Sequence, residues 1–365
     1  MTTTAGPGRD ATAADPIPIL RVDGSHREVG RAVGEATAEV LRRAVAFEGP
    51  IPGGRTLAEQ LELASRYREV TRAATPWLLE EIDGAAEGAG VDPLALFAAS
   101  IEEIWTVRPS QATAPVAGRC TDLVAGPPLT VDGHVIVGHD NDLSPRAEDE
   151  VVAVEWRVPG EPVVFSLGIG PWISVGWNDA GLSLTGNELS PNDERVGVPR
   201  LLMVREQLTA RTMDEATSMA LRADRASSYN TVFASADGGV ANVEGSATDA
   251  ELTGLGSGGW LAHANHYACD RMTRFEGDPA YARRSAVRHA RAAELLGTAA
   301  PGSVDLVAMR RFISDHATQP AICRHDAGSD GSKTVFWCVA DVTAGEIAFG
   351  RGNPCRPGEQ RWAFS

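Results

Sequence analysis

The chain has 365 residues, of which 43% are hydrophobic and 22% charged, an ordinary globular composition that allows one large domain or two smaller ones. The formal net charge is −16. This argues against general binding to nucleic acid or to anionic membranes, because both favour a basic surface. The five cysteines include no CxxC pair, which fits neither a secreted disulfide scaffold nor a thiolate zinc ribbon.

Residues 1–20 are predicted to form a disordered leader. Met1–Pro18 is rich in Thr, Ala, Gly, Asp and Pro and has no continuous apolar core, so it does not resemble a signal peptide. No apolar run elsewhere reaches the length of a membrane span. We therefore expect a soluble cytoplasmic protein with neither a membrane nor a nucleic-acid partner.

Residues 21–119 are predicted to form a helical N-terminal region. Arg27–Ala46 carries apolar residues at helical spacing, and Ser25 followed by Glu28 fits a capping box at its start. The same spacing returns in three further segments, Leu57–Thr71, Thr75–Ala89 and Pro93–Val107. Pro109–Gly118 has no period and is rich in turn-forming residues, so it is predicted to be an exposed loop.

Residues 120–365 change to short β-runs joined by turn residues. Five hairpins are predicted: Leu129–Val131 with Val135–Val137, Val151–Val158 with Val163–Ile169, Trp172–Trp177 with Leu182–Thr185, Thr231–Ser235 with Val240–Val243, and Thr334–Val339 with Glu346–Phe349. Helices interrupt at Val198–Arg222, in two pieces, at Ala282–Leu296 and at Val304–Ser314. Hairpins with segregated helices indicate an α+β fold of antiparallel sheets covered by helices, forming one body with the N-terminal region.

Cys120 is the first candidate for chemistry, because it stands where the loop meets the β-rich region. A free cysteine is more often a small buried hydrophobe. However, His139–Asp142 ends the first predicted hairpin with polar side chains, which should lie close to Cys120. Asn187 and Asn265 end other strand runs, and an Asn amide at such a position can donate to a developing oxyanion.

Two other arrangements offer alternatives. Cys323 with His316 or His325 could form the Cys–His pair of an unprocessed cysteine hydrolase. His263, His266 and Cys269 are spaced like metal ligands. The two histidines, however, are three residues apart in a strand-to-loop segment where their side chains need not converge, so no metal is predicted. A non-catalytic binding protein is a further alternative.

Several motifs in this order resemble one known family, the acyl-coenzyme A:6-aminopenicillanic acid acyltransferases of peptidase family C45. The matching segments are Gly24–Arg31 with Gly34, Cys120–Thr121, Asp132–Asp142, Gly176–Asn187, His263–Tyr267, Ser285–Leu296, Asp315–His316, Ile322–His325 and Gly352–Cys355. The resemblance extends from about Val22 to Arg361. Each motif is modest, and their number, order and spacing make the match specific.

The resemblance implies an N-terminal-nucleophile hydrolase fold, in which two stacked antiparallel sheets lie between helical layers. It also implies self-cleavage before Cys120, which leaves residues 1–119 and 120–365 as two associated chains, possibly within a homo-oligomer. The family typically has Gly directly before the cysteine, whereas Arg119 stands there in this chain. The thiol attacks the preceding carbonyl whatever its side chain, so cleavage between Arg119 and Cys120 is still expected, although bulk beside this bond can hinder it.

The resemblance also implies roles for individual residues. Cys120 would be the nucleophile, and its freed α-amine, with a pKa of about 7.7–8.0, would be the base. Asn265 would be the main oxyanion donor and Asn187 a second one, while Asp142 would orient the α-amine or the substrate. The positive charge of Arg288 would support the nucleophile, or that of Arg284 if the helical segment aligns with the family motif one turn earlier. Thr121, His139 and His266 are expected on the substrate side.

We therefore expect an amidohydrolase or N-acyltransferase that acts through an acyl-enzyme. The implied substrate is a small-molecule or peptide amide, or an acyl thioester, and no cofactor is predicted. Hydrolysis and transfer share the same acyl-enzyme, and the residues do not separate them.

Overall fold

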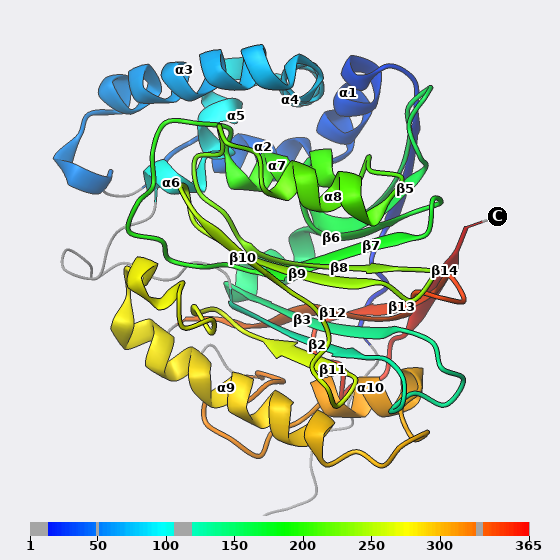
Figure 1. Ribbon diagram of the computed structural model, residues 1–365. Coiled ribbons are helices and arrows are strands. Elements are labelled where there is room, and N and C mark those ends of the chain that lie inside the picture. Colours follow the sequence, from blue (N-terminus) through cyan, green and yellow to red (C-terminus); the bar gives the residue numbers. More distant parts are fainter. Residues whose placement is uncertain (1–13, 49–50, 106–118, 326–330, 365) are drawn as a thin grey trace, which may run out of the picture.

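Two β-sheets stacked face to face form the centre of the protein (Figure 1). The computed structural model describes residues 14–48, 51–105, 119–325 and 331–364. The first sheet has the strand order β1 (Ile19–Asp23), β4 (Val151–Arg157), β5 (Val164–Ile169), β6 (Trp172–Asn178), β7 (Leu182–Asn187), β8 (Asn230–Ser235), β9 (Val240–Gly245) and β10 (Ala250–Thr253). The second has the order β11 (Trp260–His263), β2 (Arg119–Ala125), β3 (Ile136–Leu143), β12 (Lys333–Asp341), β13 (Glu346–Arg351) and β14 (Gln360–Ala363).

Helices cover the outer faces of both sheets (Figure 1). Those beside the first sheet are α1 (His26–Ala36), α2 (Ala38–Ala44), α3 (Leu57–Ala74), α4 (Pro76–Ala89), α5 (Pro93–Ala99), α6 (Glu102–Trp105), α7 (Arg200–Gln207) and α8 (Met213–Ala220). Those beside the second are α9 (Pro279–Gly297) and α10 (Leu306–Ile313). Short 3₁₀ turns occur at Pro52–Gly54, Pro145–Glu150 and Thr273–Phe275. The order helix, sheet, sheet, helix is the predicted N-terminal-nucleophile hydrolase fold. None of the described helices is long and apolar enough to cross a membrane.

The alternation of side chains along the strands builds the core and leaves one polar region within it. Val124 and Val137 of the second sheet meet Phe165 and Val232 of the first in an apolar layer between the sheets. Further along the same inward faces, the side chains become polar but stay buried: Cys120, Asp122, His139, Asn141, Thr185, Asn187, Asn230, Glu244 and His263. Buried polar groups are costly unless they are hydrogen-bonded, so this end of the layer is where a functional site is expected.

Most of the predicted elements are confirmed. The pairs β4–β5, β6–β7, β8–β9 and β12–β13 are antiparallel neighbours. Helices are present in all the segments predicted to be helical, but three of these segments are divided: Arg27–Ala46 into α1 and α2, the described part of Pro93–Val107 into α5 and α6, and Val198–Arg222, as predicted, into α7 and α8. The capping box is also present, because Glu28 accepts from the Ser25 backbone N–H at 2.8 Å. The loop predicted at Pro109–Gly118 lies outside the described residues.

The first predicted hairpin is wrong. Val135–Val137 does not pair with Leu129–Val131; β3 pairs with β2, whose strand ends at Ala125 before Pro127 and Pro128. Proline has no N–H for a sheet ladder, so the connection leaves the sheet there, and Thr130 instead forms an isolated bridge to Val304.

Strand β1 was not predicted. It runs parallel to β4 and begins at Ile19, within the range read as a leader. Ile17, just before it, is already buried in the core between the sheets.

Helices α1 and α4 pack with their backbones in close approach. A Cβ added at Gly30, Gly34, Gly84 or Gly88 would collide with a backbone carbonyl of the other helix. Only glycine permits this approach, because any side chain would force the two backbones apart. The glycines of the N-terminal motif therefore have a packing role in holding the outer helical layer together.

This contact predicts that Gly84→Ala destabilises the protein by about 1–3 kcal/mol, even though alanine favours a helix by about 1 kcal/mol. The added methyl would meet the carbonyl of Arg27. The matched control is Gly256→Ala, where a Cβ makes only an ordinary contact with Trp260. Urea unfolding of the three proteins measures the difference. Equal stability of the Gly84 and Gly256 variants would contradict the packing role.

Candidate active site

Cys120 lies near the start of β2, at the polar end of the layer between the sheets. The ladder between β2 and β3 places Cys120 opposite Asn141 and Arg119 opposite Asp142. Strand β7 of the first sheet also lies against β2. Cys120 is therefore close to the polar residues of β3, as predicted, although through a different hairpin. Its thiol is buried, with 7% of the residue exposed.

Arg288 connects Cys120 to the loop after β11. One end of its guanidinium, Nη1, donates to the Cys120 carbonyl and to Oγ1 of Thr121, each at 2.6 Å. The other, Nη2, donates to Oδ1 of Asn265 at 2.7 Å. The side chain is buried and comes from α9. Arg288 thus reaches Cys120 in the expected register, and the substitute register through Arg284 is not required.

Asn265 holds the backbone of Cys120 directly. Its Oδ1 accepts from the Cys120 N–H at 2.9 Å, and its Nδ2 donates to the carbonyl of Glu188 at 3.1 Å. Its own backbone N–H donates to Oγ of Ser285 at 2.7 Å. The Asn265 side chain is therefore fixed against β2 and against the segment that follows β7. One of its two amide hydrogens is engaged by Glu188, which leaves the second to donate elsewhere.

Asn187 is held by a chain of buried groups from three strands. Its Oδ1 lies 2.9 Å from Nδ1 of His263, whose Nε2 lies 2.8 Å from Oε1 of Glu244. Within the described residues, nothing accepts a hydrogen bond from Nδ2 of Asn187, although this atom is buried. The contact at Oδ1 thus fixes the orientation of the Asn187 side-chain amide, and its Nδ2 can donate a hydrogen bond to a bound group near β2.

Glu244 also fixes the loop that carries Asn265. Its carboxylate accepts from the backbone N–H groups of Ala268 at 2.7 Å and Cys269 at 2.9 Å. Burial works to raise the pKa of Glu244, but the hydrogen bond from His263 and these two N–H groups outweigh it and lower the pKa. His263 is therefore engaged in this chain, rather than in the set of metal ligands considered with His266 and Cys269.

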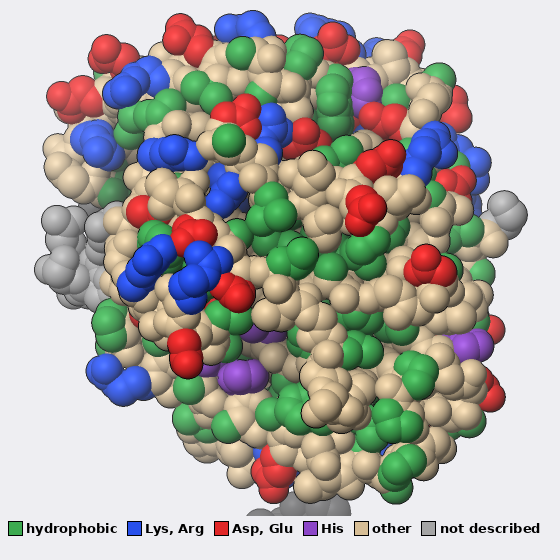
Figure 2. Space-filling view, in the orientation of Figure 1, with side chains coloured by type: hydrophobic (Ala, Val, Ile, Leu, Met, Phe, Trp, Pro, Cys, Tyr) green, Lys and Arg blue, Asp and Glu red, His purple; other side chains and the backbone are tan. Residues whose placement is uncertain are grey.

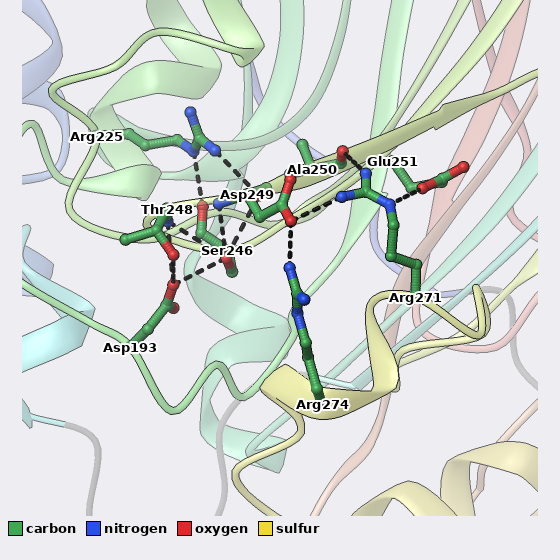
Figure 3. A network of polar contacts seen from close by, with 9 residues as sticks. All are labelled: Asp193, Arg225, Ser246, Thr248, Asp249, Ala250, Glu251, Arg271 and Arg274. Atoms are coloured by element: carbon green, nitrogen blue, oxygen red, sulfur yellow. Dashed lines mark hydrogen bonds and ion pairs between the residues drawn. The ribbon is translucent and has the colours of Figure 1, made fainter.

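Ionised side chains on the surface strengthen the same loop. Figure 3 shows Arg271 between Asp249 and Glu251, with Arg274 also bound to Asp249, so that the loop after Asn265 is tied to β10. Asp193 accepts from Ser246 and Thr248 and fixes the turn that precedes β10. Exposed pairs of this kind contribute little individually, but here several act on one turn.

Three of the remaining predicted residues are engaged with protein partners. His139 is fully buried, and its Nδ1 lies 2.8 Å from Oδ1 of Asp122. Thr121 accepts from Arg288 through its hydroxyl. His266 lies 3.0 Å from Oγ of Ser285 through its Nδ1. Burial, with the nearby histidines His263 and His289, lowers the pKa of His266 to about 3, so its ring is neutral at pH 7. Figure 2 shows histidine side chains at the surface near α9 and β11.

Buried carboxyls set the electrostatics around the thiol. Burial, together with Asp122 and Asp142, raises the pKa of the Cys120 thiol, and Arg288 opposes the rise. Burial also raises the pKa of Asp142 to about 6, against Arg288 and Arg324. Asp142 accepts from Oγ1 of Thr334 at 2.7 Å. In the intact chain the thiol is therefore kept protonated, and its reaction needs a base.

The alternative nucleophile, Cys323, also has its predicted partners nearby. Its Sγ lies 3.9 Å from Nε2 of His325, which is 2.9 Å from Nε2 of His316. Cys355 joins them, with its Sγ 3.8 Å from that of Cys323. Burial raises the pKa of the Cys323 thiol, which disfavours the reactive thiolate.

Sequence reasoning missed several residues of this site. Asp122, Glu188, Glu244 and Ser285 are all buried here. Asp122 and Glu244 lie on strand faces that otherwise point into the core, so a charged residue at an inward position was the signal that could have found them. Ser285 lies one helical turn before Arg288 on the same face of α9.

The comparisons with known proteins identify the family. Residues 130–355 match the family described as acyl-coenzyme A:6-aminopenicillanic acid acyl-transferase. The matched range begins after Cys120 and includes Asn187, Asn265 and Arg288. It covers more than half of the chain, and the chain belongs to this family.

Solved structures of two enzymes are among those that resemble the chain. A mutant of the conjugated bile acid hydrolase from Clostridium perfringens is 12% identical with a TM-score of 0.44; the match covers 67% of this chain and 97% of that one. Penicillin V acylase from Agrobacterium tumefaciens is 13% identical with a TM-score of 0.41, over 67% of this chain and 86% of that one. No curated protein matches the sequence.

The Glu244 carboxylate predicts a pH-dependent contribution to stability. Because folding lowers its pKa, the contribution is complete above the unfolded value of about 4.3 and is lost as the pH falls through the lower folded value. Glu244→Gln should therefore reduce the free energy of unfolding by about 1–3 kcal/mol at pH 7. Below about pH 4 the difference in free energy of unfolding between wild type and variant should become smaller. Urea unfolding at both pH values measures this.

Glu251→Gln is the matched control, because that side chain is 33% exposed and pairs with the exposed Arg271. It should change stability by less than about 0.5 kcal/mol. A Glu244→Gln effect as small as the control's, or one that stays constant with pH, would contradict the role given to the carboxylate.

Proposed function

We propose that the chain is a self-processing cysteine enzyme that cleaves or forms amide bonds through an acyl group carried on Cys120. The observation that carries this proposal is the shared contact of Arg288 and Asn265 with the backbone of Cys120. A buried arginine and an amide oxygen here converge on the main chain of one cysteine, on both its N–H and its carbonyl. They suit a residue whose own N–H becomes a free amine.

The first step is self-cleavage. The Cys120 thiol attacks the carbonyl carbon of Arg119, the C–N bond between the two residues breaks, and the acyl group passes from nitrogen to sulfur as a thioester. Water then hydrolyses the thioester and releases Arg119 as a carboxylate. The products are two associated chains, 1–119 and 120–365, with a free amine and thiol on Cys120.

Turnover reuses the same thiol. The α-amine, with a pKa of about 7.7–8.0, accepts the thiol proton near neutral pH. The thiolate attacks the carbonyl of an amide or acyl thioester, the leaving amine or thiol takes a proton, and an acyl-enzyme remains. Water completes hydrolysis, whereas an amine completes transfer. Asn265 holds the α-amine through its Oδ1, as it holds the N–H of the intact chain.

The oxyanion of each tetrahedral intermediate would be bound by amide donors. Asn187 is favoured by its buried Nδ2, which has no acceptor within the described residues, and by the chain through His263 and Glu244 that fixes its orientation. Asn265 would donate through its second amide hydrogen. Such fixed donors in a water-poor site are worth much more than in water.

Asp142, Thr121, His139 and His266 would act around this centre. Asp142 is opposite Arg119 in the ladder, close enough to act on the charge of the α-amine. Thr121 supports the position of Arg288, and the buried pair of His139 and Asp122 lies on the same inward face as the thiol. His266 is the half-buried member nearest to solvent and would contact the substrate. The substrate is a small-molecule or peptide amide, or an acyl thioester.

Intact mass after purification tests self-processing. Wild type should give two chains, cleaved between Arg119 and Cys120, whereas Cys120→Ala should remain one chain of 365 residues. Cys323→Ala is the control, because it removes the alternative nucleophile and should process like wild type. A wild-type chain that stays whole, or a Cys120→Ala chain that is cleaved at the same bond, would overturn the proposal.

Asn265→Ala is expected to lower kcat by about 10²–10³-fold per processed chain, because it removes an oxyanion donor and the anchor of the α-amine. The processed fraction is read from intact mass, so slower self-cleavage is separated from slower turnover. Asn192→Ala, an exposed Asn on the loop after β7, is the control and should leave kcat unchanged. Normal turnover by processed Asn265→Ala would remove this residue from the site.

A further inference from the structure

Four thiol and imidazole side chains gather at one place outside the proposed active site. They are His316, Cys323, His325 and Cys355, and one potential ligand atom from each lies within 4.8 Å of the others. The four residues are not all close in the sequence, because Cys355 comes 30 residues after His325 and follows β13. The fold itself therefore assembles the group.

The segments that carry these residues are tied together by their backbones. The N–H of Cys323 donates to the carbonyl of Asp315 at 3.0 Å, which closes the loop between His316 and Cys323. Asn353 donates through its Nδ2 to the carbonyl of Arg324 at 2.8 Å and toward Sγ of Cys323 at 3.4 Å. The position of Cys355 is thus fixed relative to the other segment, and a ligand sulfur already has an amide donor of the kind that supports metal thiolates.

The distances approach those around a tetrahedral ion, so that small side-chain shifts would bring the four atoms onto one cation. With Zn–S bonds of about 2.3 Å and Zn–N bonds of about 2.0–2.1 Å, the edges of a tetrahedron are roughly 3.3–3.8 Å. The sulfurs of Cys323 and Cys355 are 3.8 Å apart. Nε2 of His325 is 3.2 Å from Sγ of Cys355 and 3.9 Å from Sγ of Cys323. Nε2 of His316 is 2.9 Å from that of His325, closer than these edges, so a bound ion would move the two rings slightly apart.

A buried carboxyl group lies beside the group of four ligands. Asp140 is fully buried on β3, and neither of its carboxylate oxygens has a hydrogen-bond partner within the described part of the chain. It is close enough to act electrostatically on both Cys323 and Cys355. Ionising an unpaired carboxyl in the interior is costly, and a divalent cation held by the neighbouring side chains would compensate the resulting charge.

We propose that His316, Cys323, His325 and Cys355 bind one zinc ion, a borderline-soft divalent cation that takes thiolate and imidazole ligands in a tetrahedron. Four protein ligands fill the tetrahedron and leave no position for water, so the site is structural rather than catalytic. The ion joins the loop after α10, the segment that enters β12 and the end of β13. The cation also converts both thiols to thiolates, which supplies the ligand charge.

This site also gives the Cys323 cluster a use other than catalysis. A nucleophile needs one thiol and one base, whereas here a second cysteine and a second histidine complete the set. The proposal is independent of the activity proposed for Cys120, and it is tested by metal binding alone.

The test is titration of the reduced, chelator-treated full-length protein with Co²⁺, followed by Zn²⁺. Wild type should bind one Co²⁺ per chain, with the strong visible bands of a tetrahedral ion and a thiolate-to-cobalt charge-transfer band, and Zn²⁺ should displace it. Cys355→Ser and His316→Ala each remove an exposed ligand and should weaken binding by at least about 100-fold. Cys269→Ser removes a partly exposed thiol outside the group and should bind like wild type.

Two results would overturn the proposal. One is wild type binding Co²⁺ no more tightly than Cys355→Ser, or binding it without the charge-transfer band. The other is a protein isolated with Cys323 and Cys355 joined as a disulfide that fails to bind Co²⁺ after reduction. Circular dichroism of each variant checks that the fold is retained.

Discussion

The buried guanidinium of Arg288 is the contact on which the rest of the site depends. It bridges the start of β2 and the loop after β11 by donating to Cys120, Thr121 and Asn265. A buried charge is stable only when its hydrogen bonds and countercharges are supplied, and the nearby carboxyl of Asp142 provides an opposite charge. The position of Cys120 is therefore fixed by the same interactions that make the arginine tolerable in the interior.

A second constraint is the polar end of the layer between the sheets. Instead of continuing as an apolar core, this end contains two buried polar pairs, His139 with Asp122 and His263 with Glu244. Replacing buried charged pairs with well-packed apolar residues of similar volume is often neutral or stabilising. The use of the pairs here is in geometry, because the second pair fixes both Asn187 and the loop that carries Asn265. The buried polar pairs at this end of the layer thus hold amide donors near Cys120.

The parts of the fold that follow from local patterns were predicted from the sequence, such as the hairpin of β8 and β9, which turns at Asp237–Gly239. Strand β2 was missed because Cys120–Asp122 lacks the apolar alternation of a half-buried strand, and β1 because its partner β4 is distant in the chain. Motif order suggested Cys120, Asn265 and Arg288, but only tertiary packing reveals Glu244 as the partner of His263. Likewise, Cys355 could not be joined to Cys323 from spacing alone.

The most direct measurement is peptide mapping after brief alkylation of the purified native protein with a limiting amount of iodoacetamide. It tests whether one residue is both the new N-terminus and the reactive thiol. The first labelled peptide should begin at Cys120, with a free α-amine and the label on its sulfur. Label found first on Cys323 or Cys355, or on a peptide that runs continuously through Arg119 into Cys120, would contradict it.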